Sequence, residues 1–595
     1  MSEEMKVILS LRNVVVKFNV RGRILTAIRN VDLDIFENES LAIVGESGSG
    51  KSVLTKTFAG MLESNGFIPE GSIIFNDDEL SATDVKLTAR NRKTINYVIK
   101  KLNSNSVLER GAAEYREMVG LMNEIKYSKS LTLEKEAEFE ARIKEKNDDI
   151  IDKTNYIWTL DKRTDAEAFA AANAAIKSLT AEKNAIIAER ETLKNQNRAS
   201  FSGSEKERSL NERISELNKK RSEKIGKPEN AANPFGLSDE IIERNKLIAY
   251  EVLLSIGRYP YRKQVVFLNK LMKAFKLAMR IGEDLNDPAV RNKIFDVVAF
   301  RVEFRSFDEQ AQVIHGYAII DCAKIKFTND WQQIRGRRIA TVFQDPMTSL
   351  NPVITIGKQI MTVILKHQKC SAAEAKQRTI DIMSKVGIPD PEKRFDDYPF
   401  EYSGGMRQRI VIAIALSCQP KILICDEPTT ALDVTIQAQI IRLIKDLQKE
   451  LGFTTVYITH DLGVVANVAE RVAVLYGGQI VELGSVEDIF YDPKHPYTWA
   501  LLSSLPQLSE KGTDLFSIPG TPPSLYNKIV GDAFAPRSQY AMAIDLVEEP
   551  PMFKVSDTHY AKTWLLDPRA PKTEAPENIR DLHNKISKTY VDFDV

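Results

Sequence analysis

A short glycine-rich run carries the clearest chemistry in this 595-residue sequence. It reads Gly-Glu-Ser-Gly-Ser-Gly-Lys-Ser from Gly45 to Ser52, after the apolar run Leu41–Val44 and before a segment of helical character that starts at Val53. Strand, loop and helix in this order are the context in which such a loop wraps backbone N–H groups around nucleotide phosphates. We expect Lys51 to reach the β- and γ-phosphates and the Ser52 hydroxyl to ligate Mg²⁺. The spacing therefore predicts an ATP-binding loop.

A second run places two carboxylates where the phosphates of a nucleotide would lie. Residues 421–427 are apolar until they end in Asp426 and Glu427, which is typical of a buried parallel strand that delivers acids at its carboxyl end. We expect Asp426 to hold Mg²⁺ through its water shell and Glu427 to polarise the water that attacks the γ-phosphate. Together with the glycine-rich loop, the acidic pair predicts hydrolysis of ATP.

Size and composition limit what kind of protein carries these motifs. The chain exceeds one ordinary core, so two or more structural units are expected. Lysine plus arginine equals aspartate plus glutamate at 82 each, and this balance favours neither a nucleic-acid-binding nor a basic membrane-surface protein. No apolar run approaches the roughly 18–20 residues that span a bilayer, and the N-terminus lacks a signal-peptide pattern, so we expect a soluble, cytoplasmic chain. The cysteines are predicted to be reduced core thiols: Cys322, Cys370, Cys418 and Cys425.

The second half of the chain carries another anion-binding motif. Ser403, Gly404 and Gly405 precede a helical run, so a serine and exposed glycine N–H groups stand at a helix N-terminus. This motif resembles the signature of the ATP-binding-cassette (ABC) ATPases. Three further pieces resemble the Q-loop, D-loop and switch histidine of that family, and they occur in the family's order: residues 342–345, 430–433 and 457–461.

The resemblance implies a fold and a set of residue roles. The fold is an α/β, ABC-type P-loop NTPase with a RecA-like core, an antiparallel β subdomain and a helical subdomain. Two such domains face each other head to tail in this family, so the signature would act on the ATP of a partner. Catalysis is assigned to Glu427, His460 and Gln344, and Mg²⁺ to Ser52, Gln344 and Asp426. Phe18 would stack on the adenine of ATP. The signature residues are Ser403, Gly404, Gly405 and Gln408, and the D-loop residue is Asp433. The other residues expected to bind ATP are Gly45, Glu46, Ser47, Gly48, Ser49, Gly50, Lys51, Ser52, Val53, Gln344 and Asp426.

Outside these motifs the chain resembles the ATP-binding (OppD-like) subunits of oligopeptide and dipeptide importers, over roughly residues 8–80 and 331–525. The resemblance implies an ATPase that energises oligopeptide import at the cytoplasmic face of the cell membrane, where two transmembrane permease subunits hold it. Its other implied partners are a second, OppF-like ATPase subunit in a heterodimer and an extracytoplasmic substrate-binding protein, with no nucleic acid. The runs that carry the resemblance are residues 335–352, 428–440, 495–498 and 501–506.

The C-terminal segment departs from that family at a chemically important point. Related subunits often carry four cysteines that bind an iron–sulfur cluster after an Ile-Pro-Gly-x-Pro-Pro run, which here is Ile518–Pro523. Near the expected cysteine positions this chain has Asp532, Ser538, Asp545 and Thr563. A cluster is not held without thiolates, so we expect ATP and Mg²⁺ as cofactors and no iron–sulfur cluster.

About 250 residues separate a strand predicted over Gly71–Phe75 from the Q-loop, where the family has only a few, and this length indicates an insertion. Apolar residues alternate four- and three-residue steps over 139–160 and 169–193, which predicts amphipathic, partly coiled-coil-like helices. We expect the helices to fold back at a turn over 195–204, and strands over 297–304 and 317–327. The insertion is expected to be a docking arm or a spacer rather than a catalytic element. The expected domains are 1–80 and 331–505 for the ABC ATPase, 81–330 for the insertion and 506–595 for the tail.

Other classes of ATPase fit the sequence less well. Chromosome-tethering ATPases of the SMC type carry long coiled coils and bind DNA, but their coils emerge between Q-loop and signature, and here Gln344 to Ser403 is a short interval. A translation-type ABC protein would need two phosphate loops. An importer of dipeptides, nickel or another small solute remains open, because this subunit contacts the membrane protein and not the cargo.

Overall fold

The computed structural model describes residues 6–158, 164–226, 234–257, 259–298, 300–325, 328–429, 432–504, 517–527, 529–576 and 579. The chain forms two compact units. The first comprises Met1–Glu79 and Ile319–Val595, and the second comprises Leu80–Ala318. Within the described residues, no helix is both long and apolar enough to cross a bilayer.

The larger sheet of the first unit is built around the strand that precedes the glycine-rich loop. All five residues of β3 (Ser40–Val44) are buried, and β3 pairs in parallel with β10 and β11 on its two sides. A strand enclosed in this way needs an unbroken apolar run, which explains the sequence before the loop. The strand order is β13-β14-β12-β11-β3-β10-β9-β8. The other strands are β8 (Ile339–Val342), β9 (Ile422–Asp426), β10 (Thr454–Ile458), β11 (Arg471–Tyr476), β12 (Gln479–Ser485), β13 (Phe553–Lys554) and β14 (Tyr560–Ala561).

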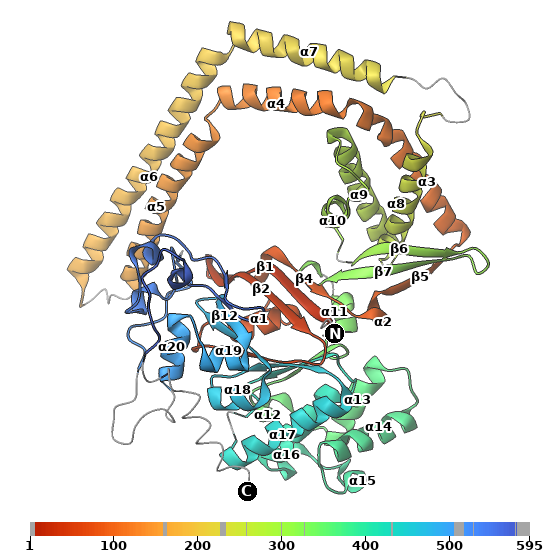
Figure 1. Ribbon diagram of the computed structural model, residues 1–595, viewed down its shortest axis with the longest axis vertical. Helices are drawn as coiled ribbons and strands as arrows, with labels where there is room; N and C mark the ends of the chain where they lie inside the picture. The colour runs from red at the N-terminus through yellow and green to blue at the C-terminus, as the bar shows by residue number, and fades with distance from the viewer. Residues whose placement is uncertain are drawn as a thin grey trace. The chain divides into compact units, whose positions relative to one another are not determined.

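Several helices of the first unit pack against this sheet through an apolar core that includes buried residues of α13, α16 and α17. The first of them, α1, follows the glycine-rich loop directly, and α16 begins at the signature motif (Figure 1). The longer helices are α1 (Lys51–Phe58), α11 (Thr328–Ile334), α13 (Ile356–His367), α14 (Ala372–Lys385), α16 (Gly404–Leu416), α17 (Val434–Leu451), α18 (Leu462–Val468), α19 (Val486–Tyr491) and α20 (Pro496–Ser503). The short ones are α2 (Asp78–Ser81), α12 (Pro346–Ser349) and α15 (Pro391–Arg394).

An antiparallel sheet completes the first unit. Its strand β1 (Val7–Val20) pairs with β2 (Arg23–Phe36) and with β4 (Gly66–Phe75). The two ends of the insertion meet at this sheet, because Ile74 pairs with Asp321 and Phe75 with Ile320 of β7 (Val313–Asp321). The Asp321 carboxylate also accepts a hydrogen bond from the Ile73 N–H at 3.0 Å. The strand predicted over Gly71–Phe75 is therefore the second half of β4.

Two pairs of long helices form the arm of the second unit. In Figure 1, α5 (Leu133–Trp158) lies beside α6 (Ala166–Phe201), and α4 (Ala112–Ser128) lies beside α7 (Glu205–Ile225). Phe139 and Ile186 are buried against each other's helix with Ile143 and Leu193, so the predicted apolar seams do pack together. Along the rest of the arm, ion pairs cross between the helices, such as Lys146–Glu182 at 2.8 Å and Arg213–Glu117 at 3.1 Å.

The predicted fold-back over residues 195–204 is wrong. Helix α6 continues to Phe201, and the break is only Ser202–Ser204, where Gly203 has φ +80° and the Ser204 hydroxyl caps α7. Polar side chains did not end the helix, because the Asn197 amide finds a partner in the Ser130 carbonyl at 2.5 Å. The chain instead reverses between α5 and α6, a connection whose residues 159–163, including the predicted seam residue Leu160, lie outside the described part of the chain.

The strands of the second unit also differ from those predicted over 297–304 and 317–327. They are β5 (Ala82–Lys86), β6 (Phe300–Asp308) and β7, and β7 ends at Asp321 because the Asp321 side chain accepts from the Ala323 N–H and starts a turn of 3₁₀ helix. Residues 326 and 327 lie outside the described part. The remaining helices of this unit are α3 (Ala89–Ser106), α8 (Asp239–Gly257), α9 (Tyr261–Ile281) and α10 (Pro288–Phe295).

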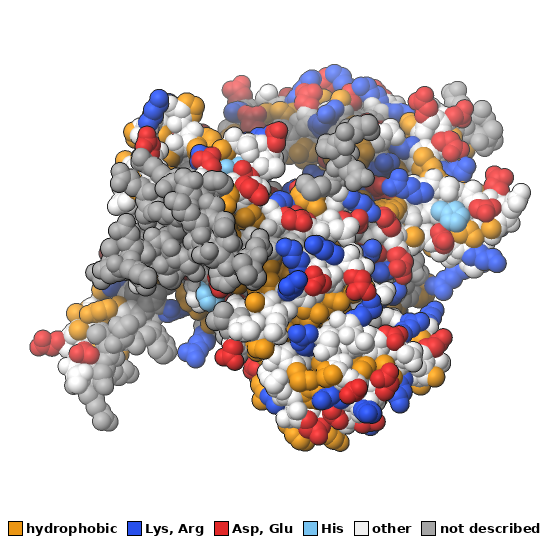
Figure 2. Space-filling view, turned by 60° about the horizontal axis from the view of Figure 1, so that its bottom comes forward, with side chains coloured by type: hydrophobic (Ala, Val, Ile, Leu, Met, Phe, Trp, Pro, Cys, Tyr) orange, Lys and Arg blue, Asp and Glu red, His pale blue; other side chains and the backbone are white. Residues whose placement is uncertain are grey.

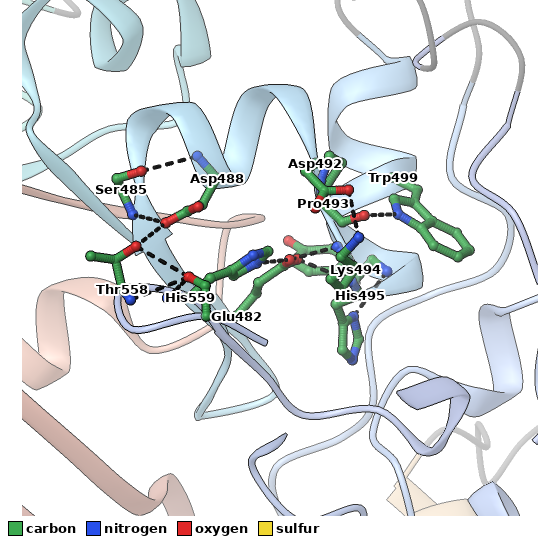
Figure 3. Close-up of polar contacts among 12 residues, drawn as sticks. Glu482, Ser485, Asp488, Asp492, Pro493, Lys494, His495, Trp499, Thr558 and His559 are labelled. Atoms are coloured by element: carbon green, nitrogen blue, oxygen red, sulfur yellow. Dashed lines mark hydrogen bonds and ion pairs between the residues drawn. The ribbon is translucent and has the colours of Figure 1, made fainter. Parts of the chain in front are cut away.

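The tail after residue 516 is anchored on the edge of the larger sheet. Strand β14 pairs with β12. The buried Glu482 of β12 accepts hydrogen bonds from the backbone N–H groups of Lys494 (2.6 Å) and His495 (3.1 Å). His559 of the tail contacts the same carboxylate through Nε2 at 2.8 Å, as Figure 3 shows. A buried carboxylate needs such partners, so Glu482 fastens the tail to the sheet.

Three of the four positions that would carry cluster cysteines are buried polar residues here, and the fourth, Ser538, is half-buried. Asp532, Asp545 and Thr563 are each at most 9% exposed. Asp532 Oδ1 accepts from the Phe534 N–H at 2.9 Å, and Oδ2 lies 4.0 Å from His495 Nε2. Burial raises the pKa of Asp532 to about 6 and lowers that of His495 to about 4. The cysteines lie elsewhere as free thiols, with Cys322, Cys418 and Cys425 buried and Cys370 half-buried, in line with the prediction of core thiols.

The pairing of β4 with β7 predicts that the insertion is dispensable for the first unit. Replacing residues 80–318 with a short Gly/Ser linker should preserve cooperative melting and ATP affinity, because the cost of closing a loop grows only logarithmically with its length. A matched deletion of residues 80–321 also removes Ile320 and Asp321, the β7 residues that pair with β4, so its melting temperature should be lower by several degrees. Loss of nucleotide binding in a soluble, folded 80–318 deletion would contradict the prediction.

The buried Asp532 predicts a pH-dependent stability. Because its pKa is raised on folding, the ionised carboxylate opposes folding above about pH 6, and this cost disappears as the pH falls below the unfolded value near 4. Asp532→Asn keeps the acceptor for Phe534, so the variant should melt several degrees above the parent at pH 8 and match it near pH 4. Asp557→Asn, at an exposed tail position, is the control. A lower melting temperature of Asp532→Asn at pH 8 would show the interpretation to be wrong.

Candidate functional site

The glycine-rich loop is shaped by close approach of other backbone segments. Gly45 has φ +150°, and a Cβ there would lie 2.2 Å from the Leu475 carbonyl oxygen. Gly50 has φ +105° and precedes the first helical residue of α1, and a Cβ on it would meet the Ala27 carbonyl oxygen at 2.9 Å. Only glycine fits both positions. The loop thus delivers the unpaired N–H groups of the α1 N-terminus, which is a ready anion-binding site.

Lys51 stands at the centre of the loop. Its ammonium group donates to the carbonyl oxygens of Gly45 at 2.7 Å and Glu46 at 2.9 Å. Burial lowers the pKa of Lys51, and the nearby carboxylates of Glu427, Asp426 and Glu46 oppose that change. The ammonium is therefore held over the loop, desolvated, where a phosphate group would receive a strong charge-assisted hydrogen bond.

Two strand ends bring Ser52 and Asp426 together. Asp426 is the last residue of β9, and its Oδ1 accepts a hydrogen bond from the Ser52 hydroxyl at 3.1 Å. Burial raises the pKa of Asp426, with Ser52, Lys56 and Lys51 acting in the opposite direction. A hydroxyl and a carboxylate oxygen are hard donors, and a divalent cation would supply the positive charge that this desolvated carboxylate lacks.

Glu427 is held between the other two residues for which catalysis is predicted. Gln344, after β8, donates from Nε2 to Glu427 Oε2 at 2.7 Å, and His460 Nδ1, after β10, lies 3.1 Å from Glu427 Oε1. The Glu427 backbone has φ +46°, and its N–H donates to the Ile458 carbonyl at 2.9 Å. The structure thus gathers Gln344, Glu427 and His460 from three separate strand ends beside the Ser52–Asp426 pair.

The signature residues lie at the start of α16. The Ser403 hydroxyl caps the helix by accepting from the Met406 N–H, and a Cβ on Gly405 would meet Ile436 at 2.6 Å, so close packing on α17 explains that glycine. Gln408 is fully buried, and its amide has no hydrogen-bond partner among the described residues. Asp433 precedes α17, while Thr430 and Ala431 of the predicted D-loop lie outside the described part. Phe18 lies in β1 with its ring edge against Gly66.

Three residues around the loop were missed by the sequence reasoning. The Tyr497 hydroxyl accepts from the Glu46 N–H at 2.7 Å, and Arg537 pairs with the Glu46 carboxylate and with the Tyr476 hydroxyl. Tyr497 falls within residues 495–498, one of the runs that resemble importer subunits, and this was the available signal for it. Arg537 lies beyond residue 525, where the sequence resemblance weakens. Nothing along the chain links them to a loop more than 400 residues away.

Comparison with known proteins places this site in a family. The family model described as "ABC transporter" matches residues 28–211 and 304–430, just over half of the chain, and the model "Oligopeptide/dipeptide transporter, C-terminal region" matches residues 481–544. The oligopeptide transport ATP-binding protein AmiE of Streptococcus pneumoniae is 63% identical over 309 residues, which cover 51% of this chain and 85% of AmiE.

Two further relatives agree. The oligopeptide transport ATP-binding protein OppD of Bacillus subtilis is 61% identical over 44% of this chain and 73% of its own length. The oligopeptide transport ATP-binding protein OppD of Mycoplasma genitalium is 42% identical over 46% of this chain and 78% of its own length. The strand–loop–helix site, the convergent acids and these matches lead to one conclusion: the chain belongs to the ATP-binding proteins of the ABC transporter family and is an ATPase.

Proposed function

We propose that this chain hydrolyses ATP to energise the import of oligopeptides through a membrane ABC transporter. The observation that carries the proposal is the position of Glu427, held by Gln344 and His460 beside the Ser52–Asp426 pair at the end of the phosphate loop. The cargo is inferred from the match of residues 481–544 to the peptide-transporter C-terminal region and from the names of the relatives.

In this proposal each group at the strand ends has one task. Lys51 and the α1 N-terminus bind the phosphates, and Glu427 orients the attacking water and accepts its proton. Gln344 and His460 hold the Glu427 carboxylate in place through its two oxygens. Phe18 stacks on adenine, and Ser403, Gly404, Gly405 and Gln408 act on the ATP of a partner subunit, with Asp433 at the same interface.

Mg²⁺ is the metal that this donor set fits. Ser52, Asp426 and Gln344 offer hydroxyl, carboxylate and amide oxygens, which are the ligands magnesium prefers beside phosphates. When bound, the ion would neutralise charge on the phosphate oxygens.

A surface for the permease subunits lies next to the Q-loop. Met347 and Phe400 are 62% and 68% exposed although both are apolar. Arg407 links them, because it hydrogen-bonds the Met347 sulfur and the Phe400 carbonyl oxygen. The Tyr398 ring stacks on Phe400 at 5.7 Å. An exposed apolar patch of this kind is typical of a surface that binds another protein. Because it is joined to the segment of the catalytic Gln344, it suits a subunit that couples movement of the cargo channel to the ATP site. Such docking would hold the chain at the cytoplasmic face of the membrane.

The remaining partners follow from the same assignment. A second, related ATPase subunit would complete the composite ATP sites, and an extracytoplasmic binding protein would deliver the peptide. An importer of dipeptides, nickel or another small solute is the alternative, since none of the described site residues contacts cargo in this mechanism. A DNA-tethering role is disfavoured, and on the face drawn in Figure 2 basic and acidic side chains are interspersed.

Substitution of Glu427 tests the hydrolytic role. Glu427→Gln removes the proton acceptor, while its one amide oxygen still accepts from Gln344 Nε2 and its NH2 group takes the place of the oxygen that faces His460. ATP turnover in the assembled transporter should therefore fall roughly 10²- to 10⁴-fold with little change in ATP affinity. Lys51→Ala should instead weaken ATP binding itself, measured by equilibrium titration. Near-normal turnover in Glu427→Gln would reject its role, and unchanged affinity in Lys51→Ala would reject that of the lysine.

Uptake by the reconstituted transporter tests the cargo. Proteoliposomes that contain the chain with its permease subunits and binding protein should accumulate a labelled oligopeptide only when ATP is supplied on the side of the ATPase. The Glu427→Gln transporter should not accumulate it. ATP-dependent uptake of a dipeptide or of Ni²⁺, with none of the longer peptide, would replace the proposed cargo with the alternative.

A further inference from the structure

The C-terminal tail forms an ion pair with Glu46, the second residue of the phosphate loop. Arg537 donates from Nη1 to Glu46 Oε2 at 2.7 Å and from Nη2 to Glu46 Oε1 at 3.1 Å. This bidentate ion pair joins residues 491 positions apart in the sequence. We propose that Arg537 is a positioning residue for ATP: it holds the phosphate loop through Glu46 and cancels the negative charge that Glu46 would otherwise present to the phosphates.

The guanidinium is fixed by more than the ion pair. Arg537 Nε donates to the Pro519 carbonyl at 2.8 Å, and Nη1 also donates to the Tyr476 hydroxyl at 3.1 Å. Its side chain is 5% exposed and stands against the rings of Tyr476 and Phe534. A guanidinium that is buried and makes bidentate hydrogen bonds is held in one orientation, whereas the side chains of an exposed surface ion pair are not.

On the loop side, Glu46 is tied to Lys51. The Glu46 carbonyl oxygen accepts from Lys51 Nζ at 2.9 Å and from the Ser49 N–H at 3.2 Å, while its own N–H donates to Tyr497. A shift of Glu46 therefore moves an acceptor that holds the phosphate-binding ammonium. Through this one residue the tail acts on the part of the loop that contacts ATP.

Arg537 also compensates a charge on the loop. The loop must hold a polyanion, yet Glu46 adds a carboxylate to it, and like charges repel each other. Arg537 neutralises that carboxylate from the side away from solvent. Without the arginine, an uncompensated, half-buried anion would remain beside the phosphates.

The rest of the tail keeps its place without the arginine. The Leu525 carbonyl accepts from the Thr26 N–H at 3.1 Å, β14 pairs with β12, and Asp532 donates its N–H to the Asp545 carbonyl at 2.7 Å. Glu482 and His559 add the buried contact shown in Figure 3. These contacts do not involve Arg537, so a substitution there should change the loop rather than release the tail.

The test compares ATP affinities of full-length variants, and it rests on the proposed ATP-binding role of the loop. Arg537→Gln should weaken the Kd for ATP, measured by equilibrium titration, about tenfold. The double variant Glu46→Gln/Arg537→Gln should bind ATP at least about threefold more tightly than Arg537→Gln, because the amide carries no charge to repel the phosphates. A purely structural role for Arg537 would not be rescued by Glu46→Gln.

A matched control separates this proposal from the proposed function. Arg569→Gln removes an exposed tail arginine that pairs with Asp567, and its ATP affinity should equal that of the parent. If the parent and this control bind no ATP, the proposed function fails. If the parent binds ATP and Arg537→Gln binds it equally well, or the double variant is as weak as Arg537→Gln, the role of Arg537 is overturned.

Hydrogen exchange on the unmodified chain gives an answer even if Arg537→Gln does not fold. Coupling between two sites is reciprocal, so a non-hydrolysable ATP analogue with Mg²⁺ should slow exchange at residues 518–538 at least about twofold. Residues 553–566, anchored on β12 instead, should not change. Protection confined to the loop at 45–52 would contradict the proposal.

Discussion

The burial of β3 between β10 and β11 is the constraint on which the rest of the site depends. Parallel neighbours end at the same edge of a sheet, so every loop that leaves this edge converges on the turn after Val44. Gln344 follows β8, Asp426 ends β9 and His460 follows β10. Residues from distant parts of the chain therefore become neighbours because of strand order alone.

Charge compensation follows from the same geometry. The strand ends collect carboxylates and an ammonium in a partly desolvated space, where an unpaired charge is costly. Each of these groups has a local partner: Lys51 has loop carbonyls, Asp426 has Ser52, and Glu46 has Arg537. The tail supplies one of these partners and is held to the sheet by Glu482 and His559.

The second unit is stabilised in a different way. Its arm has a narrow apolar seam around Phe139 and Ile186, with ion pairs between largely exposed side chains along the rest of its length. Exposed ion pairs contribute little stability, so the length of the paired helices and the seam maintain the arm. Because Phe75 and Ile320 pair directly, the first unit closes its own sheet across the point where the insertion begins and ends.

The sequence by itself determined whatever depends on residues close together in the chain. The strand–loop–helix around Gly45–Ser52, the acids at the end of β9 and the helical seams of the arm are local patterns, and all were predicted. The tertiary structure decided where helices end and which distant groups meet. Helix α6 runs through the polar residues predicted as a turn because Asn197 finds a partner on another segment. Glu46 and Arg537 meet across 491 residues. Such contacts leave no periodicity or motif in the sequence, since their energy arises only when the folded sheet brings the two groups together.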